Sequence, residues 1–307
     1  MAQTSGIFAA LSDQVAKVIV DFTKQGLVEN DPIHPKLFSD KSTTKKFERF
    51  QSIAPFGTAP RKGEGEEYSF DQIQAGYTKD ITPLEYGFGF LWTETAQEDD
   101  DFEVLGQYSK WLGFSVRIMQ ETQAAAVLND GLAGTVLTAD GLALFSTAHL
   151  LKRGGTAKNK LSTAMDLSVT ALAQMRADMR MNTKLESGQL VRPQSEFYLV
   201  HHPDNEALAI RICNSEKMPL EANNDINPTQ KIMKVTPLCW EYISDSDATF
   251  LVAKKSSSHG LKMLSRVKPR LNPVRVDPKT GNNIVSIRVR QVWDAFDWRN
   301  IAATEGA

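Results

Sequence analysis

The stretch LEYGFGFLW, from Leu84 to Trp92, alternates large apolar side chains with other residues. Successive side chains of a β-strand point to opposite faces, so a period of two residues is typical of a strand. The alternation puts five large apolar side chains on one face: Leu84, Tyr86, Phe88, Phe90 and Trp92. We therefore predict a strand over Leu84–Trp92 with one strongly apolar face.

A long helix is predicted directly after this strand. Thr95 and Glu98 fit a capping box, and Asp99 to Asp101 follow in the first turn, where negative charge suits the helix dipole. An apolar stripe then continues to the turn signal NDG, which predicts a helix over residues 95–129, on the order of 50 Å long at ~1.5 Å per residue. Such a length is typical of a strut. The stripe consists of Phe102, Leu105, Leu112, Val116, Met119, Gln123 and Ala126.

On the N-terminal side of Leu84, the segment EEYSF (residues 66–70) begins another strand-like alternation. We predict that it pairs with Leu84–Trp92 through the connection DQIQAGYTKD (residues 71–80). The product would be a long two-stranded projection. A two-stranded ribbon is marginally stable alone, so it needs a partner surface.

The rest of the chain mixes helix and strand patterns without a regular βαβ rhythm, which predicts an α+β fold. Helices are expected from Asp166 and over residues 204–213, the second with Asp204 as N-cap. Strands are expected within residues 195–203, 231–240, 248–256 and 282–298. In the last strand one face carries Val285, Ile287 and Val289, and the other carries Ser286, Arg288 and Arg290. An amphipathic helix is expected near the N-terminus, with Ile7, Phe8, Leu11, Val15, Val18, Ile19 and Phe22 at helical spacing.

Composition excludes several classes of protein. The 307 residues are 41% hydrophobic and 23% charged, which is an ordinary globular balance. A formal charge of −2 argues against a protein that wraps nucleic acid by itself. Cys213 and Cys239 form no CxxC motif, so we expect two buried, reduced thiols. No secretory signal is visible, and no apolar run approaches the ~20 residues of a membrane span.

The stretch LFSTAHLL (residues 144–151) offers Ser146 and His149 as a nucleophile and base. No GxSxG elbow surrounds them, and a catalytic triad is defined by three-dimensional geometry rather than by nearness in sequence. We favour a buried corner in which Leu144, Phe145, Leu150 and Leu151 anchor the core. There Ser146, Thr147 and His149 would bond to backbone groups.

Other candidate sites are equally weak. His201, His202 and Asp204 have metal-binding side chains, but neighbours on a strand point to opposite faces. The run EDDD (residues 98–101) fits a solvated helix start, and the glycines of KRGGT and RKGEGEE match no phosphate-loop motif. Arg288 and Arg290 could touch phosphates or line an interface. The sequence therefore predicts no catalytic, cofactor-binding or metal-binding residues and no cofactor.

Three stretches resemble the major capsid proteins of tailed bacteriophages with the Hong Kong 97 fold. LEYGFGFLWTETAQEDDDFEVL is similar to the junction of that family's extended loop and spine helix. GLALFSTAHLL resembles the LFSTAHP motif of Mu-like major head subunits, with Leu150 in place of the usual proline. DAFDWRNIAATEG is similar to the closing strand of that group. The resemblance covers residues 22–306.

The resemblance implies a domain layout. Residues 1–31 would be an N-terminal arm, and residues 50–92 an extended loop that lies across a neighbouring subunit. Residues 32–49, 93–186 and 255–307 would form a peripheral domain with the spine helix. Residues 187–254 would form an axial domain.

The resemblance also implies a function. Such proteins assemble through hexamers and pentamers into an icosahedral shell around double-stranded DNA, which they contact without sequence specificity. The expected partners are other copies of the chain, a portal protein, a separate scaffolding protein and a decoration protein, with no membrane. The expected location is the virion, after assembly in the cytoplasm of the host bacterium. Lys62 and Lys79 lie in the extended loop, and we expect no covalent crosslinking.

Two alternatives stay open at the level of sequence. One is another shell of the same fold, such as an encapsulin, which would hold enzyme cargo in place of DNA. The other is a metal-dependent hydrolase that uses His149, His201, His202 and Asp204. We expect a structural protein without enzymatic activity.

Overall fold

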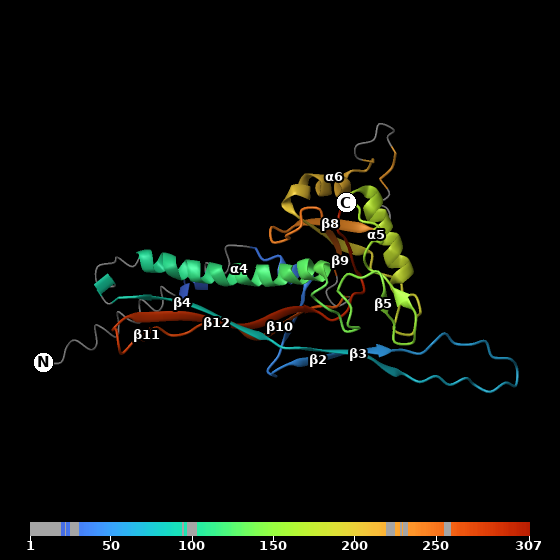
Figure 1. The fold of residues 1–307 in the computed structure, drawn as a ribbon, viewed down its shortest axis with the longest axis horizontal. Helices are drawn as coiled ribbons and strands as arrows, with labels where there is room; N and C mark the ends of the chain where they lie inside the picture. The colour runs from blue at the N-terminus through green and yellow to red at the C-terminus, as the bar shows by residue number, and fades with distance from the viewer. Residues whose placement is uncertain are drawn as a thin grey trace.

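The computed structural model describes residues 20–21, 23–24, 31–93, 95–96, 103–218, 225–227, 229, 233–254 and 259–307. The predicted N-terminal helix lies outside this set, apart from a few helical positions near residue 20, and so do Glu98 and Asp99 to Asp101 of the predicted helix start. The predicted N-cap Thr95 is described and is itself helical; the Thr93 hydroxyl accepts from the Ala96 N–H at 3.1 Å, so the assignment of Thr95 as N-cap is wrong. Figure 1 shows a long body, a smaller body at one end of it, and an arm that extends from the same end.

The long body combines one helix with a five-stranded sheet. Helix α4 (Glu103–Ala133) runs along strand β12 (Asn283–Ala295), as Figure 1 shows. β12 pairs antiparallel with β10 (Leu261–Leu271), β4 (Leu84–Trp92) and β11 (Arg275–Val276), and β1 (Ser39–Ser42) pairs parallel with β10. A short helix, α2 (His34–Leu37), precedes β1 and contacts α4.

The predicted alternation of the last long strand is confirmed. Val285, Ile287 and Val289 of β12 are buried and form one core cluster with Leu112 and Val116 of α4. Trp92 of β4 completes the cluster. Burial of a large apolar side chain contributes roughly 1.5–3 kcal/mol, so this interface is a main source of stability for the long body.

The strand over Leu84–Trp92 is confirmed, but its predicted partner is wrong. EEYSF is not a strand, and β4 instead pairs with β12, from Leu84 opposite Gln291 to Trp92 opposite Asn283. The projecting ribbon is made by β2 (Glu48–Ala54) and β3 (Gln74–Ile81), with residues 55–73 between them. We call this projection, residues 48–81, the arm; it is distinct from the predicted N-terminal arm. The physical reason for the observed pairing is the apolar face of β4, which a free ribbon would leave in water. Here Trp92, Tyr86 and Phe90 of that face pack against the cluster that α4 forms with β12, although Phe88 stays largely exposed.

The smaller body is built on a four-stranded sheet in the order β13-β9-β7-β8. Its strands are β7 (Glu196–His201), β8 (Lys234–Cys239), β9 (Thr249–Ala253) and β13 (Ile301–Thr304). Helices α5 (Val169–Asn182) and α6 (Glu206–Asn214) share a core with this sheet. These elements confirm the predicted order of helices and strands. Together with the first sheet they confirm the α+β class.

The N-termini of α5 and α6 are built differently, and an N-cap was predicted only for α6. At α5 the hydroxyl of Ser168 accepts a hydrogen bond from the Ala171 N–H, 3.0 Å away. At α6 the predicted cap Asp204 is wrong, because a 3-10 turn over Pro203–Asn205 precedes the helix. In that turn the Asp204 N–H donates to the His202 ring instead.

Helix α4 joins the two bodies through a buried carboxylate. The Glu121 side chain lies 2.7 Å from His34 Nδ1 of α2, and its other oxygen accepts from Trp240 Nε1 at 3.0 Å. Trp240 follows β8 of the smaller body and His34 belongs to α2 of the long body, so a single residue of α4 contacts both bodies. Burying a carboxylate costs free energy unless its oxygens are hydrogen-bonded, and here both are.

The stretch LFSTAHLL forms a fixed corner after α4. His149 is fully buried; its Nδ1 lies 2.8 Å from Asp140 Oδ2 and its Nε2 lies 3.1 Å from Asn159 Oδ1. The ring stacks on Trp298 at a centroid distance of 4.5 Å. His149 therefore bonds to side chains, whereas the prediction assigned it to backbone groups.

The four apolar residues of the corner differ in burial. Leu144, Phe145 and Leu151 are buried as predicted, but Leu150 is 47% exposed, so its predicted place in the core is wrong. Leu150 lies in the two-residue strand β5 (His149–Leu150), which pairs with β6 (Thr156–Ala157). Adjacent strand residues face opposite sides, so a buried His149 places Leu150 at the surface.

Replacement of His149 by alanine is expected to lower the free energy of unfolding by about 2–4 kcal/mol, because it leaves buried Asp140 and Asn159 oxygens without their partner. Urea unfolding of the subunit, followed by circular dichroism, measures the change. Thr147→Ala is the matched control, since Thr147 is exposed in the same stretch. Equal stability of both variants would contradict the structural role of His149.

Asp140 gives the corner a pH dependence. Burial opposes ionisation of this carboxyl, but hydrogen bonds from His149 and Thr138 outweigh it, so its pKa lies below the ordinary 3.8. A group with a lowered folded-state pKa adds stability above its unfolded pKa and loses it as the pH falls through the folded value. We expect the stability difference between wild type and Asp140→Asn to narrow as the pH falls below 3.8. Urea unfolding at a series of pH values measures it; a constant difference would refute the assignment.

Candidate assembly surfaces

Of the residues considered for catalysis or metal binding, His202 and Asp204 lie close together, with His202 Nδ1 3.2 Å from Asp204 Oδ2, but no third candidate ligand among the described residues joins them. Ser146 Oγ accepts from the Ala148 N–H and makes no recorded contact with His149. His201 is buried in β7, where its Nδ1 donates to the carbonyl of His202. Within the described ranges, no group of three His, Cys, Asp or Glu residues is placed to hold a metal ion. The acidic run at residues 98–101 lies outside those ranges.

Both cysteines are free thiols. Cys213 is buried and Cys239 half-buried, and burial is the main cause that raises the pKa of each to about 11. A thiol with so high a pKa carries almost no reactive thiolate at neutral pH. Among the described helices, none combines the length and apolar character that a membrane crossing requires.

Among the described residues, the two most exposed large apolar side chains, Phe70 and Tyr68, lie on the arm. Phe70, between β2 and β3, is 93% exposed. Four further large side chains of the arm are exposed: Ile53, Phe56, Tyr68 and Ile73. A soluble monomer rarely presents such a set on one projection, so the arm has the character of an interaction surface.

Ion pairs hold the base of the arm against the body. Lys79 of β3 donates to Asp294 Oδ1 at 2.6 Å and to the carbonyl of Ala295 at 2.9 Å, both at the end of β12. Across the ribbon, Arg49 forms a bidentate pair with Asp80. The arm therefore leaves the body in a defined direction, and Lys79 is committed to contacts within its own chain.

The arm is held a second time further out. Arg153 lies 2.8 Å from Asp71, whose other contact is the N–H of Gly57 on the facing side of the loop. These two donors lower the pKa of the Asp71 carboxyl to about 2. Arg153 belongs to the stretch KRGGT, and Gly154 and Gly155 both have positive φ. The glycines therefore form a turn that presents Arg153 to the arm, and not a phosphate loop.

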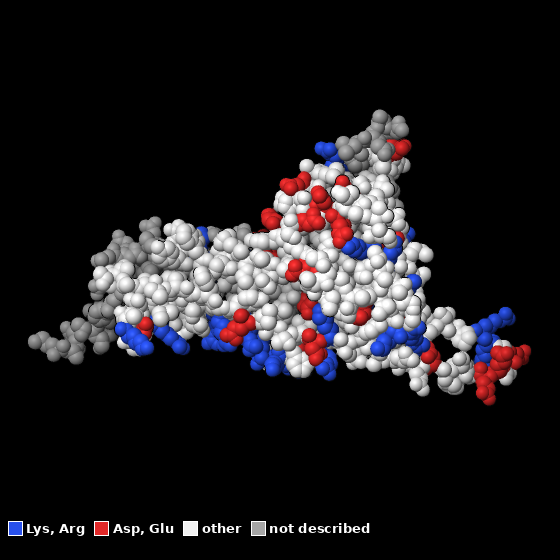
Figure 2. Space-filling model, viewed as in Figure 1, with Lys and Arg blue, Asp and Glu red and all other residues white. Residues whose placement is uncertain are grey.

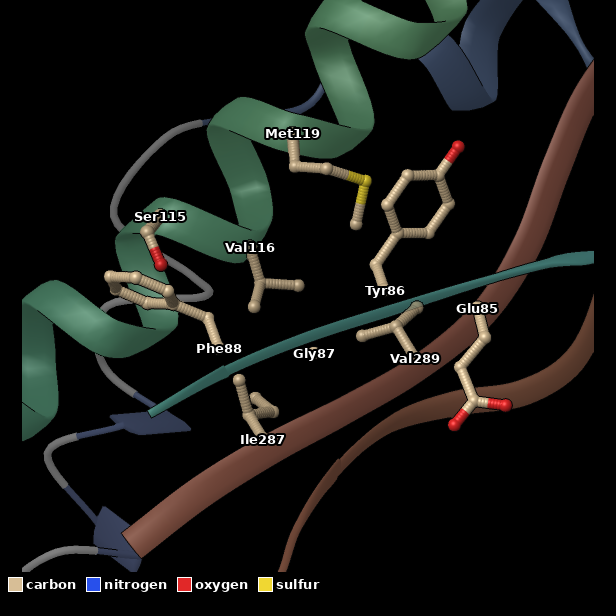
Figure 3. Close-up of a pocket in the computed structure, with 9 residues that line it drawn as sticks. All are labelled: Glu85, Tyr86, Gly87, Phe88, Ser115, Val116, Met119, Ile287 and Val289. Atoms are coloured by element: carbon tan, nitrogen blue, oxygen red, sulfur yellow. The ribbon is translucent and has the colours of Figure 1, made fainter. Parts of the chain in front are cut away.

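An apolar groove of about 450 Å³ opens between α4 and β4. Figure 3 shows Met119 and Val116 of α4 facing Tyr86 and Phe88 of β4, with Val289 close by. Phe88 is itself largely exposed, so the groove presents apolar surface to solvent. Beyond it, Tyr108 and Trp111 of α4 are also exposed.

These surfaces were only partly predictable. The alternation of β4 identified Tyr86 and Phe88 as members of an apolar face. The alternation of Tyr68 and Phe70 in EEYSF instead led to a strand prediction that was wrong, and it did not indicate an exposed loop. Phe56, Tyr68 and Phe70 lie among glycine, proline and acidic residues, and this is the only sign in the sequence that they are exposed. The arrangement as a whole offers no reacting groups; it offers apolar surfaces for another macromolecule.

Comparison with known proteins agrees with this description. A model of the phage capsid protein family matches residues 76–304. A search of curated proteins finds no match. Among solved structures, the capsid of the cyanophage P-SCSP1u is similar with a TM-score of 0.62 at 9% identity, over 90% of this chain and 88% of that one.

Two further structures are similar. The virus-like particle from Pyrococcus furiosus has a TM-score of 0.56 at 10% identity, over 94% of this chain and 98% of that one. The procapsid of bacteriophage JBD30 has a TM-score of 0.55 at 14% identity, over 99% of this chain and 76% of that one. These likenesses confirm the Hong Kong 97-type fold. Since the family match includes β4, α4 and every strand of the two main sheets except β1, the chain belongs to the phage capsid protein family and is a structural, self-associating component of the virion.

Proposed function

We propose that this chain is the major capsid protein of a tailed phage, which assembles through hexamers and pentamers into an icosahedral shell around double-stranded DNA. The observation that carries the proposal is the arm, because five large exposed apolar side chains are stable in water only when another molecule covers them. In a shell that molecule is a neighbouring copy. Many weak contacts of this kind add up to a stable closed assembly.

The proposed layout follows the resemblance. Residues 1–31 form the N-terminal arm and residues 50–92 the extended loop. Residues 32–49, 93–186 and 255–307 form the peripheral domain, and residues 187–254 the axial domain at the centre of each capsomer. The pairing of β4 with β12 supports a shorter free loop than residues 50–92, because β4 is part of the main sheet.

The proposal includes partners and place of assembly. A portal protein, a separate scaffolding protein and a decoration protein complete the particle, which forms in the cytoplasm of the host bacterium. The protein has no enzymatic activity. The motifs GLALFSTAHLL and DAFDWRNIAATEG further support a relation to Mu-like head subunits.

Expression of the chain, alone or with a scaffolding protein, followed by electron microscopy, tests the proposal. We expect capsomers or closed shells. A monomer that stays monomeric at high concentration would refute the capsid function, and shells that hold enzyme cargo in place of DNA would favour the encapsulin alternative.

The double variant Tyr68→Ser/Phe70→Ser tests the role of the arm. Both side chains are exposed, so the variant is expected to keep the unfolding free energy of the wild type within about 0.5 kcal/mol while losing most of its assembled material. Light scattering and size-exclusion chromatography measure assembly. Met181→Ser, which removes an exposed apolar side chain from α5 outside the proposed axial domain, is the control. Normal shells from the arm variant would count against a covered arm.

A further inference from the structure

Charge is unevenly distributed along this nearly neutral chain. Residues 261–290, which include β10, β11 and the first half of β12, contain eight of the 35 Lys and Arg residues and only one of the 37 Asp and Glu residues. The rest of the chain is correspondingly acidic. Figure 2 shows blue side chains gathered along the lower edge of the long body, over these strands, and red ones more frequent around α6 and β8.

We call six exposed or half-buried cations of this region the basic strip: Lys268, Arg270, Arg275, Lys279, Arg288 and Arg290. The pairing places the four arginines on the side of the sheet away from α4, while Lys268 lies at a register shift in β10 and Lys279 in the turn between β11 and β12. Arg270 is directly opposite Arg288, and Arg275 is directly opposite Ile284, which lies on the outward face of β12. Four members, Lys268, Arg270, Arg275 and Lys279, form no ion pair with any carboxylate in the described part of the chain.

The strip is not neutralised from within. Glu85 is its principal acidic neighbour; it forms a bidentate pair with Arg288 at 2.8 and 3.0 Å and lies 3.5 Å from Arg290. One carboxylate thus serves two guanidinium groups, and Arg270 lies opposite Arg288 without one. Like charges directly opposite each other on neighbouring strands are destabilising. Binding of anions from outside would therefore stabilise this face by reducing the repulsion between its cations.

Gly87 leaves the surface beside Arg288 without a side chain. Gly87 lies on β4 opposite Arg288 of β12, and its φ is not in the left-handed region. An added Cβ would meet only the Ile287 carbonyl, at 3.8 Å, which is an ordinary contact. Nothing inside the chain requires glycine here, although glycine weakens a strand. In strands a glycine often marks the close approach of a ligand.

We propose that the basic strip contacts the sugar-phosphate backbone of the packaged double-stranded DNA, without sequence specificity. This inference rests on the proposed function and names the surface that meets the DNA. Alternate residues of a strand are ~7 Å apart, so Arg288 and Arg290 are neighbours along β12, and Arg270 lies beside Arg288 on β10. Guanidinium groups bind phosphate oxygens bidentately.

A second copy of the chain fits this face less well. The core of a stable protein interface is depleted of charge and filled by large apolar side chains. The middle of this face instead holds arginines between Gly87, Gly89 and Ser286. A surface of cations and small residues suits a polyanion.

The test measures binding of a short fluorescent duplex of random sequence to the purified, unassembled subunit, at several salt concentrations. The strip variant is Lys268→Gln/Arg270→Gln/Arg275→Gln, whose side chains are exposed and unpaired, so folding is expected to be unchanged. We expect binding at least about tenfold weaker, and a log–log salt slope reduced by about 0.9 for each cation that contacts a phosphate.

The matched control is Arg180→Gln/Arg192→Gln/Arg211→Gln, which removes three exposed cations from α5, α6 and a nearby loop. It changes net charge equally and is expected to bind like the wild type. Equal binding by the strip variant and the wild type, or equal loss in both variants, would overturn the proposal. A strip variant that binds DNA normally but fails to assemble would assign the face to copy–copy contact and would overturn it too.

Electron microscopy of the wild type separates this inference from the function on which it rests. Wild-type shells together with unchanged DNA binding by the strip variant would sink the inference and leave the capsid function standing. Absence of any wild-type assembly would remove the capsid function itself.

Discussion

Strands β4 and β12 pair along the whole length of β4, and α4 covers the apolar face that this pairing creates. This contact fixes three segments at once and brings β12, near the C-terminal end of the chain, against β4 and α4. Once β4 is held by β12, only the chain before it can project, so the arm is built from β2 and β3. The same pairing leaves the opposite face of the sheet free for charge.

A subunit of a closed shell must keep a defined shape, and two kinds of interaction hold the two bodies of this molecule together. The apolar core runs without interruption from α4 into the smaller body through Leu128, Phe145 and Phe250. Glu121 adds a polar link with strict geometry, because its oxygens must meet His34 and Trp240 to compensate for burial. Apolar contact supplies most of the stability, and the hydrogen-bonded carboxylate restricts how the two bodies fit together.

Periodicity predicted the elements better than their partners. Alternation identified β4 and β12, and the apolar stripe identified α4, which ends at Ala133, close to the predicted Asn129. Alternation says which side chains share a face but not which strand lies alongside, so the pairing of EEYSF with β4 was wrong. The predicted partners of His149 were wrong for a similar reason. The fold brings Asp140, Asn159 and Trp298 to the ring, and no local sequence pattern predicts these contacts.

An enzyme concentrates its function in a few converging side chains, and a motif search is suited to find them. Here function is spread over surfaces, so that search found scattered histidines that belong to the core. The informative features arise only from pairing: Arg270 and Arg288 are neighbours because β10 meets β12, and Gly87 joins them from a strand nearly two hundred residues earlier. A sheet with one face buried by α4 and the other cationic has two different sides. Such a difference between sides is what a shell subunit needs, because every copy must present the same side to the interior.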